Sequence, residues 1–189
     1  MEVLLNIEEV RDHVENLDDP KAEETVRKAV GLQEKDSVAC VNIGPGADVL
    51  VLMIVFKVTW TIFQLPGNLK KSLEGWEWLV NKLKSFAKKK ELVSLDLDSA
   101  GLFAIDYLAE KYGDDSSFNL LDAHCFKIHD ISGMYPNNKD ILAAHPHNYY
   151  VFTFYIADRI LVMSVRSTGE IRELEAFIDM PYGLLDFKE

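Results

Sequence analysis

The 189-residue sequence predicts a single α+β domain, in which helices pack against a mainly antiparallel sheet. Hydrophobic residues make up 48% of the chain, which is enough to bury one core at this length. Short polar links separate three β-rich segments near the C-terminus, and one long amphipathic helix is expected near the middle. We expect one domain over residues 1–189, divided into a helical segment (1–36), a mixed core (37–131) and an antiparallel meander (148–178).

Residues 1–36 are expected to form two short helices. Asn6 stands three residues before Glu9, which is the spacing of a helix N-terminal cap. Asp19 and Pro20 begin a second helix with proline at its first position, and Gly31 ends it. The buried residues expected for the first helix are Ile7, Val10, Val14 and Leu17, and those for the second are Ala22, Val26, Ala29 and Val30.

The longest apolar run in the chain is Ala47–Leu65. It is long enough to span a membrane, but Lys57 would then lie near the bilayer centre at a cost of about 2.5–3.5 kcal/mol. β-Branched residues are frequent, and polar Lys57 and Thr59 alternate with Val58 and Trp60. We therefore predict a core strand, with a buried helix as the second interpretation and a transmembrane span as the third.

Leu69–Phe86 carries apolar residues at helical spacing and is followed by three lysines. Trp78 falls outside the apolar face, so Trp78 and Lys82 are candidate binding residues. The main interpretation is a helix that packs on the core with a solvated basic face. The alternative is peripheral membrane association through the amphipathic segment Lys70–Lys90.

The remaining elements alternate between strand and helix before the meander. The expected segments are a strand at Leu92–Leu97, a helix at Ser99–Tyr112, an extended segment at Phe118–Ile131, and meander strands at Tyr149–Ile156, Ile160–Arg166 and Ile171–Phe177. The meander links are short and polar, as in antiparallel hairpins.

Four of the five histidines lie between His124 and His147, close to Cys125. Imidazole nitrogens and thiolates suit zinc, and a catalytic zinc site needs three protein ligands. In a strand, Cys125 and His129 share one face and His124 lies on the other. The candidate metal ligands are therefore His129, His145 and His147, with Cys125 or Asp130 as an alternative further ligand. No standard zinc spacing is present, and histidines in a polar loop are more often structural.

Two further chemistries have weaker support. Asp96 and Asp98 follow a predicted strand and could bind Mg²⁺, but Asp98 or Ser99 as the cap of the next helix explains them more simply. Cys125 lies among apolar residues and is expected to be buried and unreactive. The sequence contains no phosphate-binding loop, no serine-hydrolase motif and no metalloprotease motif.

The formal net charge of −11 disfavours nucleic-acid binding, because phosphate backbones are repelled. The first residues lack the basic region of a secretory signal, so we expect a cytoplasmic protein without a transmembrane span. From these observations we expect a non-catalytic, acidic protein-binding module, such as an adaptor, inhibitor or immunity-type protein, with a protein partner of basic character. The alternative is a metal-dependent hydrolase that uses the His124–His147 cluster and zinc.

Overall fold

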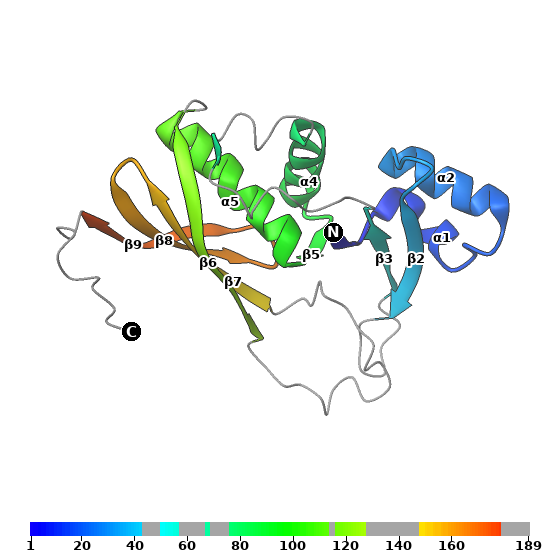
Figure 1. Cartoon of the computed structure of the whole chain (residues 1–189). Coiled ribbons are helices and arrows are strands. Elements are labelled where there is room, and N and C mark those ends of the chain that lie inside the picture. Colours follow the sequence, from blue (N-terminus) through cyan, green and yellow to red (C-terminus); the bar gives the residue numbers. More distant parts are fainter. Residues whose placement is uncertain (43–49, 57–66, 69–75, 114–115, 128–147, 179–189) are drawn as a thin grey trace, which may run out of the picture.

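The protein has an α+β fold with two antiparallel sheets, as predicted from the sequence. The computed structural model describes residues 1–42, 50–56, 67–68, 76–113, 116–127 and 148–178. Figure 1 shows the sheets at opposite ends of the molecule, with helices α4 and α5 between them. One hydrophobic cluster contains residues from both sheets and from the helices. The extent of the domain includes residues outside these ranges and stays a prediction.

The first sheet has the strand order β2-β3-β1-β5. Its strands are β1 (Glu2–Leu5), β2 (Ser37–Asn42), β3 (Leu50–Val55) and β5 (Leu92–Leu95). The prediction that residues 1–36 are helical is wrong at β1, which pairs with both β3 and β5. Val3, Leu4 and Leu5 are fully buried, so the strand has no alternation of apolar and polar residues by which it could be recognised.

Three helical elements follow β1: the 3₁₀ helix η1 (Glu8–Val10), α1 (Arg11–Val14) and α2 (Pro20–Val30). Asn6 does not cap the first of them, because Ile7 occupies that position without a side-chain bond. Helix α2 has the predicted ends: the Asp19 side chain accepts a hydrogen bond from Lys21 N (3.0 Å), and Gly31 adopts a φ of 65°. In α2, Ala22, Val26 and Val30 are buried, whereas Ala29 is exposed, contrary to the prediction.

The apolar run forms a core strand over its described part, as predicted. Strand β3 pairs with β1 on one side and β2 on the other. Leu52 and Ile54 join the main hydrophobic cluster, whereas Val51 packs with Leu4 on the opposite face of the sheet. Residues 47–49 and 57–65 of the run lie outside the described residues.

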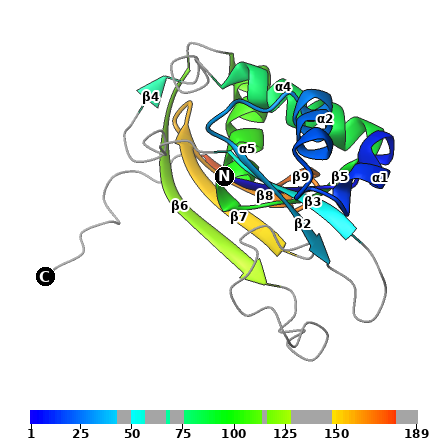
Figure 2. The same ribbon diagram turned by 90° about the vertical axis from the view of Figure 1, so that its right-hand side faces the viewer.

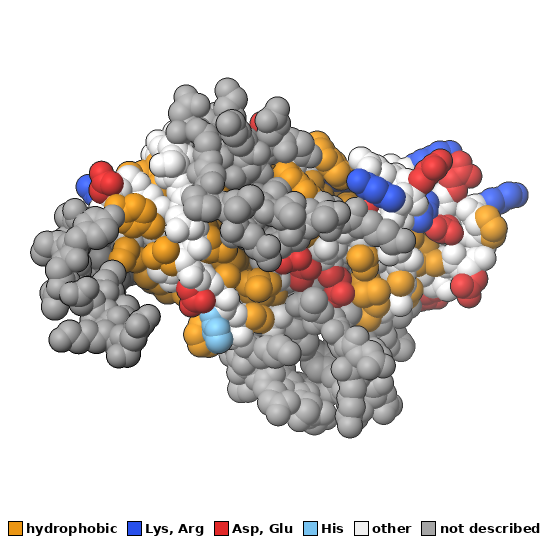
Figure 3. All heavy atoms as spheres, in the orientation of Figure 1, with side chains coloured by type: hydrophobic (Ala, Val, Ile, Leu, Met, Phe, Trp, Pro, Cys, Tyr) orange, Lys and Arg blue, Asp and Glu red, His pale blue; other side chains and the backbone are white. Residues whose placement is uncertain are grey.

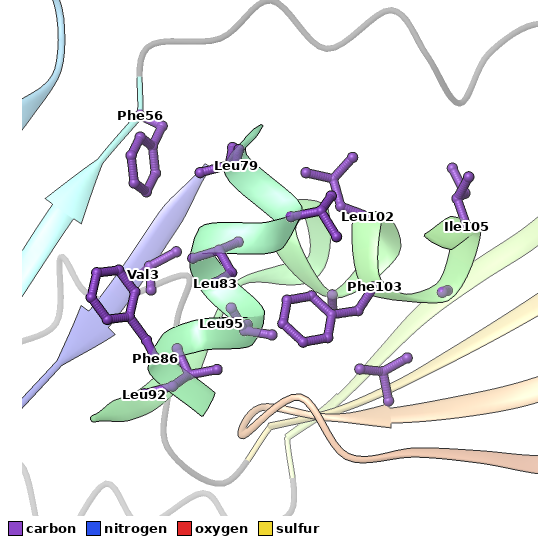
Figure 4. Packing of buried hydrophobic residues seen from close by; sticks show 14 of the residues in the cluster. Val3, Phe56, Leu79, Leu83, Phe86, Leu92, Leu95, Leu102, Phe103 and Ile105 are labelled. Carbon is purple, nitrogen blue, oxygen red and sulfur yellow. The ribbon is translucent and has the colours of Figure 1, made fainter. Parts of the chain in front are cut away.

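Helix α4 (Glu77–Lys89) buries Leu79, Val80, Leu83 and Phe86 and leaves Trp78 exposed, in agreement with the predicted faces. The first part of the predicted helix, residues 69–75, is not described. Helix α5 (Leu97–Tyr112) follows β5 after one residue and contacts strands of both sheets. Figure 4 shows Phe103 of α5, Leu83 of α4 and Leu95 of β5 in the same apolar layer. The helices therefore connect the two sheets through a shared core. Among the described helices, none is both long and apolar enough to cross a bilayer.

The second sheet has the order β4-β6-β7-β8-β9. Its strands are β4 (Gly67–Asn68), β6 (Ser117–Lys127), β7 (Asn148–Ile156), β8 (Arg159–Arg166) and β9 (Ile171–Ile178). The predicted meander is confirmed, since β7 pairs with β8 and β8 with β9. Ala157 and Asp158 both have positive φ angles (49° and 58°), the conformation that joins two antiparallel strands tightly.

Candidate functional site

Buried polar side chains gather where the two sheets meet. Five of the buried polar residues in the described ranges lie on β5, at the start of α5, at the start of β7 and in the turn after β8. They are Ser94, Asp96, Ser99, Asn148 and Ser167. The sheets are bonded directly at this junction, because Leu95 N donates to Ser167 O at 2.7 Å. A buried polar cluster needs internal partners, so its hydrogen bonds decide whether it has a structural or a chemical role.

Both carboxylate oxygens of Asp96 are occupied by backbone donors. Oδ1 accepts from Ser99 N at 2.8 Å, and Oδ2 accepts from Glu2 N at 2.6 Å. The first bond caps α5, and the second ties α5 to β1. The helix cap is therefore Asp96, whereas the sequence suggested Asp98 or Ser99. With both oxygens used in this way, Asp96 is a structural carboxylate and not a free cation ligand.

Asp98 lies beside this cap in the first turn of α5 and is half-buried. Partial burial and the nearby Asp96 carboxylate raise the pKa of Asp98. Figure 3 shows a small group of acidic side chains in the middle of the molecule, close to the N-terminus marked in Figure 1. Within the described ranges, no group of three or more His, Cys, Asp or Glu residues is arranged to bind a metal ion.

Tyr150 completes the junction from the second sheet. Its hydroxyl donates to Leu95 O at 2.6 Å and accepts from Asn148 Nδ2 at 3.0 Å. Burial raises the pKa of Tyr150 well above its ordinary value, so the phenol stays protonated. This buried phenol, bonded to a main-chain carbonyl of β5, therefore joins the two sheets.

The proposed metal ligands His129, His145 and His147 lie outside the described residues. His124 is described: it is exposed on β6, and its ring centroid lies 4.5 Å from that of Phe126. Cys125 on the same strand packs against the core but is only half-buried, whereas its apolar neighbours predicted full burial. The histidine cluster therefore remains a prediction from sequence.

Trp78 and Lys82 lie one turn apart on α4 but have different surroundings. Trp78 is 40% exposed, and its ring meets Phe56 edge-on at 6.3 Å. The Lys82 ammonium lies against Gly31 at the C-terminal end of α2, where a Cβ atom would collide with it. Burial lowers the pKa of Lys82, and the Asp36 carboxylate acts in the opposite direction. Lys82 is thus engaged with α2, and Trp78 is the accessible residue of the pair.

The second sheet has an apolar face on the side away from α5, which was not predicted from the sequence. Residues of β7 alternate strictly between buried and half-buried, so one set faces α5 and the other faces outward. The register assigns Phe126, Tyr149, Val151, Tyr155, Ile160 and Val162 to the outward apolar set, and the exposed Leu121 and Leu174 stand at the register shifts of β6 and β9. We call these eight residues the outer face. In the sequence of β7, both alternating sets of side chains are largely apolar. A strand with one solvated face would instead carry polar side chains in one of the two sets.

Comparisons with known proteins give no functional information. No family model, no curated protein and no solved structure matches the chain.

Proposed function

We propose that this protein is a non-catalytic protein-binding module, of the adaptor, inhibitor or immunity type, and that it binds its partner through the outer face. One observation carries the proposal. Leu121, Phe126 and Leu174 are 50%, 50% and 54% exposed, and they supply three of the four exposed large hydrophobic residues in the described ranges. Exposed apolar residues that gather on one face are typical of protein interaction sites.

The contacts within this face give it the character of a binding surface. The Phe126 ring lies tilted against the His124 ring, and the Tyr149 hydroxyl accepts a hydrogen bond from Ser164 Oγ at 3.3 Å. Aromatic side chains of this kind present a large contact area and lose little conformational entropy on binding. The neighbouring Arg166 and Arg172 both form ion pairs with Glu170 at the end of the sheet, so the rim of the outer face is polar.

The junction between the sheets supports a non-catalytic role. Asp96 accepts hydrogen bonds that join α5 to β1, and the Tyr150 hydroxyl joins β7 to β5. Membrane association through α4 has little support, since Leu79, Leu83 and Phe86 of its apolar face are packed in the core. The net charge of −11 favours a partner with basic residues around an apolar contact.

The test is a set of matched pull-downs from the source cells with the wild-type protein, Phe126→Asp and Trp78→Ala. A specific partner should be enriched by the wild type and by Trp78→Ala, and lost with Phe126→Asp. With the purified partner, calorimetry should show that Phe126→Asp weakens binding by roughly tenfold or more. Circular dichroism of each variant establishes that the fold is retained.

Three outcomes would contradict the proposal. A partner lost with Trp78→Ala and retained with Phe126→Asp would place binding on α4 and refute the outer face. Failure to enrich any protein would count against a binding module. Stoichiometric zinc in the purified protein, lost in His145→Ala, would favour the metal-dependent hydrolase.

A further inference from the structure

The turn between β8 and β9 lies at the junction of the two sheets and is held there by backbone hydrogen bonds. Ser167 N donates to Asn148 O at 3.0 Å, and Ser167 O accepts from Leu95 N at 2.7 Å. Arg166 N donates to Glu170 O at 2.8 Å, which closes the turn. Contacts with β5 and β7 therefore fix the backbone of this turn. A fixed backbone lowers the entropy cost of presenting side chains to a ligand.

The side chains of Arg166, Glu170 and Arg172 form one ion-paired group at this end of the outer face, which we call the arginine corner. Arg166 is paired in register with the outward-facing Tyr149, so its side chain lies on the same side of the sheet. Arg172 is paired with Ser164, whose hydroxyl donates to the Tyr149 hydroxyl. Arg166 Nη1 lies 2.9 Å from Glu170 Oε2, and Arg172 Nη2 lies 2.7 Å from Glu170 Oε1. All three charged side chains are exposed.

Glu170 does not neutralise the two arginines. Two positive charges facing one negative charge leave one positive charge in excess at the arginine corner. Glu170 accepts from Nη1 of Arg166 and from Nε and Nη2 of Arg172. Two guanidinium groups carry many more N–H donors than one carboxylate has acceptor positions. The corner therefore has both the charge and the donors to bind an added anion.

Two aromatic side chains continue the outer face from the arginine corner. Tyr149 is paired with Arg166 on one side and with Phe126 on the other, so the three side chains form one row across β8, β7 and β6. Figure 2 shows β6 and β7 curving around α5, which leaves the outer face on the convex side of the sheet. A row of aromatic rings that ends at a guanidinium group fits a ligand with an apolar part and an anionic part.

We propose that the arginine corner binds a carboxylate side chain of the partner protein, from an aspartate or a glutamate, next to apolar groups that contact Tyr149 and Phe126. The inference rests on the proposed function, because it names what the partner places at one end of the outer face. Guanidinium groups bind carboxylates through paired, charge-assisted hydrogen bonds. The single excess charge matches a carboxylate, whereas a phosphate group with nearly two charges would be repelled more strongly by Glu170.

The charge of the corner is opposite in sign to the net charge of −11. Surface charges act over about 8 Å at physiological ionic strength, because salt screens them beyond that distance. The acidic chain as a whole therefore favours approach of a basic partner, while the group that contacts Arg166 and Arg172 is acidic. The partner is expected to carry a carboxylate at the contact and basic residues farther from it.

The test uses two small probes that share an aromatic ring, phenylacetate and its neutral counterpart phenylacetamide. Heteronuclear NMR follows the Nε–Hε signals of Arg166 and Arg172 during each titration of the full chain. Phenylacetate should shift both signals and bind in the millimolar range, as expected for a ligand of this size. Phenylacetamide should bind roughly tenfold more weakly, because the hydrogen bonds to a charged group are lost.

Two variants change the excess charge in opposite directions. Glu170→Gln removes the competing carboxylate, so phenylacetate should bind several-fold more tightly. Arg172→Gln should weaken binding by roughly tenfold. The matched controls are Glu24→Gln, which removes another exposed, ion-paired carboxylate on α2, and Arg159→Gln, which removes an exposed arginine at the other end of β8. Both controls should leave the affinity for phenylacetate almost unchanged.

The same variants are then measured with the purified partner, where Arg172→Gln should weaken binding and Glu170→Gln should strengthen it. Equal affinity for the two probes, no shift at either arginine, or no gain in Glu170→Gln would each overturn the inference. Because Glu170→Gln is expected to bind more tightly, loss of fold in Arg172→Gln leaves the test decisive.

Failure of this inference is distinguishable from failure of the proposed function. A partner that is lost with Phe126→Asp but binds Arg172→Gln as tightly as the wild type would refute only the carboxylate contact. A partner that binds Phe126→Asp unchanged would refute the outer face as the binding site, and the inference with it.

Discussion

The Tyr150 hydroxyl of the second sheet donates a 2.6 Å hydrogen bond to the Leu95 carbonyl of the first sheet. The two residues are 55 positions apart in the chain, and both are fully buried. The adjacent Leu95 N donates to Ser167 O, so both backbone polar groups of Leu95 bond to the second sheet. The junction between the sheets is thus hydrogen-bonded as well as apolar.

Tyr150→Phe should destabilise the protein by about 1–3 kcal/mol, because the buried Leu95 carbonyl loses its phenolic donor while the ring remains. Urea unfolding followed by circular dichroism measures the change. The matched control is Tyr149→Phe, since Tyr149 is half-buried and its hydroxyl accepts a longer, 3.3 Å bond from Ser164 Oγ. Equal losses of unfolding free energy in the two variants would show that the bond from Tyr150 to Leu95 contributes no more to stability than the bond between Ser164 and Tyr149.

Asp96→Ala should cost about 2–4 kcal/mol of unfolding free energy. It removes the cap of α5 and the acceptor of Glu2 N together, and each loss is worth about 1–2 kcal/mol. Asp96→Asn keeps one acceptor oxygen and should lie between the wild type and Asp96→Ala. Denaturant unfolding gives the order of the three proteins, and an Asn variant as stable as the wild type would mean that only one of the two bonds contributes to stability.

Asp98→Asn should stabilise the protein at neutral pH and have a smaller effect in acid. The pKa of Asp98 is raised above its ordinary value of 3.8 by burial and by Asp96, so the folded state favours the protonated form. The contribution of this group to stability is therefore greatest below pH 3.8 and falls as the pH rises through the raised pKa of the folded state.

The measurement for Asp98 is the difference in Tm between variant and wild type as a function of pH. A difference in Tm between Asp98→Asn and the wild type that does not change with pH would contradict the raised pKa.

Gly169→Ala should be more destabilising than Gly113→Ala, although both glycines have a similar positive φ (86° and 89°). A Cβ at Gly169 would lie 2.8 Å from Phe103 Cε1, whereas a Cβ at Gly113 would have no neighbour within 4 Å. A positive φ costs a residue with a Cβ atom about 1–3 kcal/mol at either position, and overpacking against Phe103 adds about 1–3 kcal/mol at Gly169. Thermal unfolding compares the two variants, and an equal loss would show that Phe103 moves aside freely.

Local patterns were sufficient for several elements and for part of the candidate surface. The ends of α2 followed from Asp19, Pro20 and Gly31, because capping and left-handed termination involve neighbouring residues only. The meander followed from short polar links between β-rich segments, and the exposure of Trp78 followed from helical periodicity. The outer face was missed because strand alternation reveals two different faces only when one of them is polar.

The sequence by itself determined the α+β class, the C-terminal meander and the apolar face of α4, since these depend on periodicities within about a dozen residues. Only the tertiary structure decided that β1 lies between β3 and β5, that Asp96 bonds to Glu2, and that Leu95 forms hydrogen bonds with Ser167 and Tyr150 of the second-sheet segment.

 The physical reason is the distance along the chain. Leu95 and Tyr150 meet because the core brings α5 against both sheets, and a contact between residues 55 positions apart leaves no periodic signal in the sequence around either one.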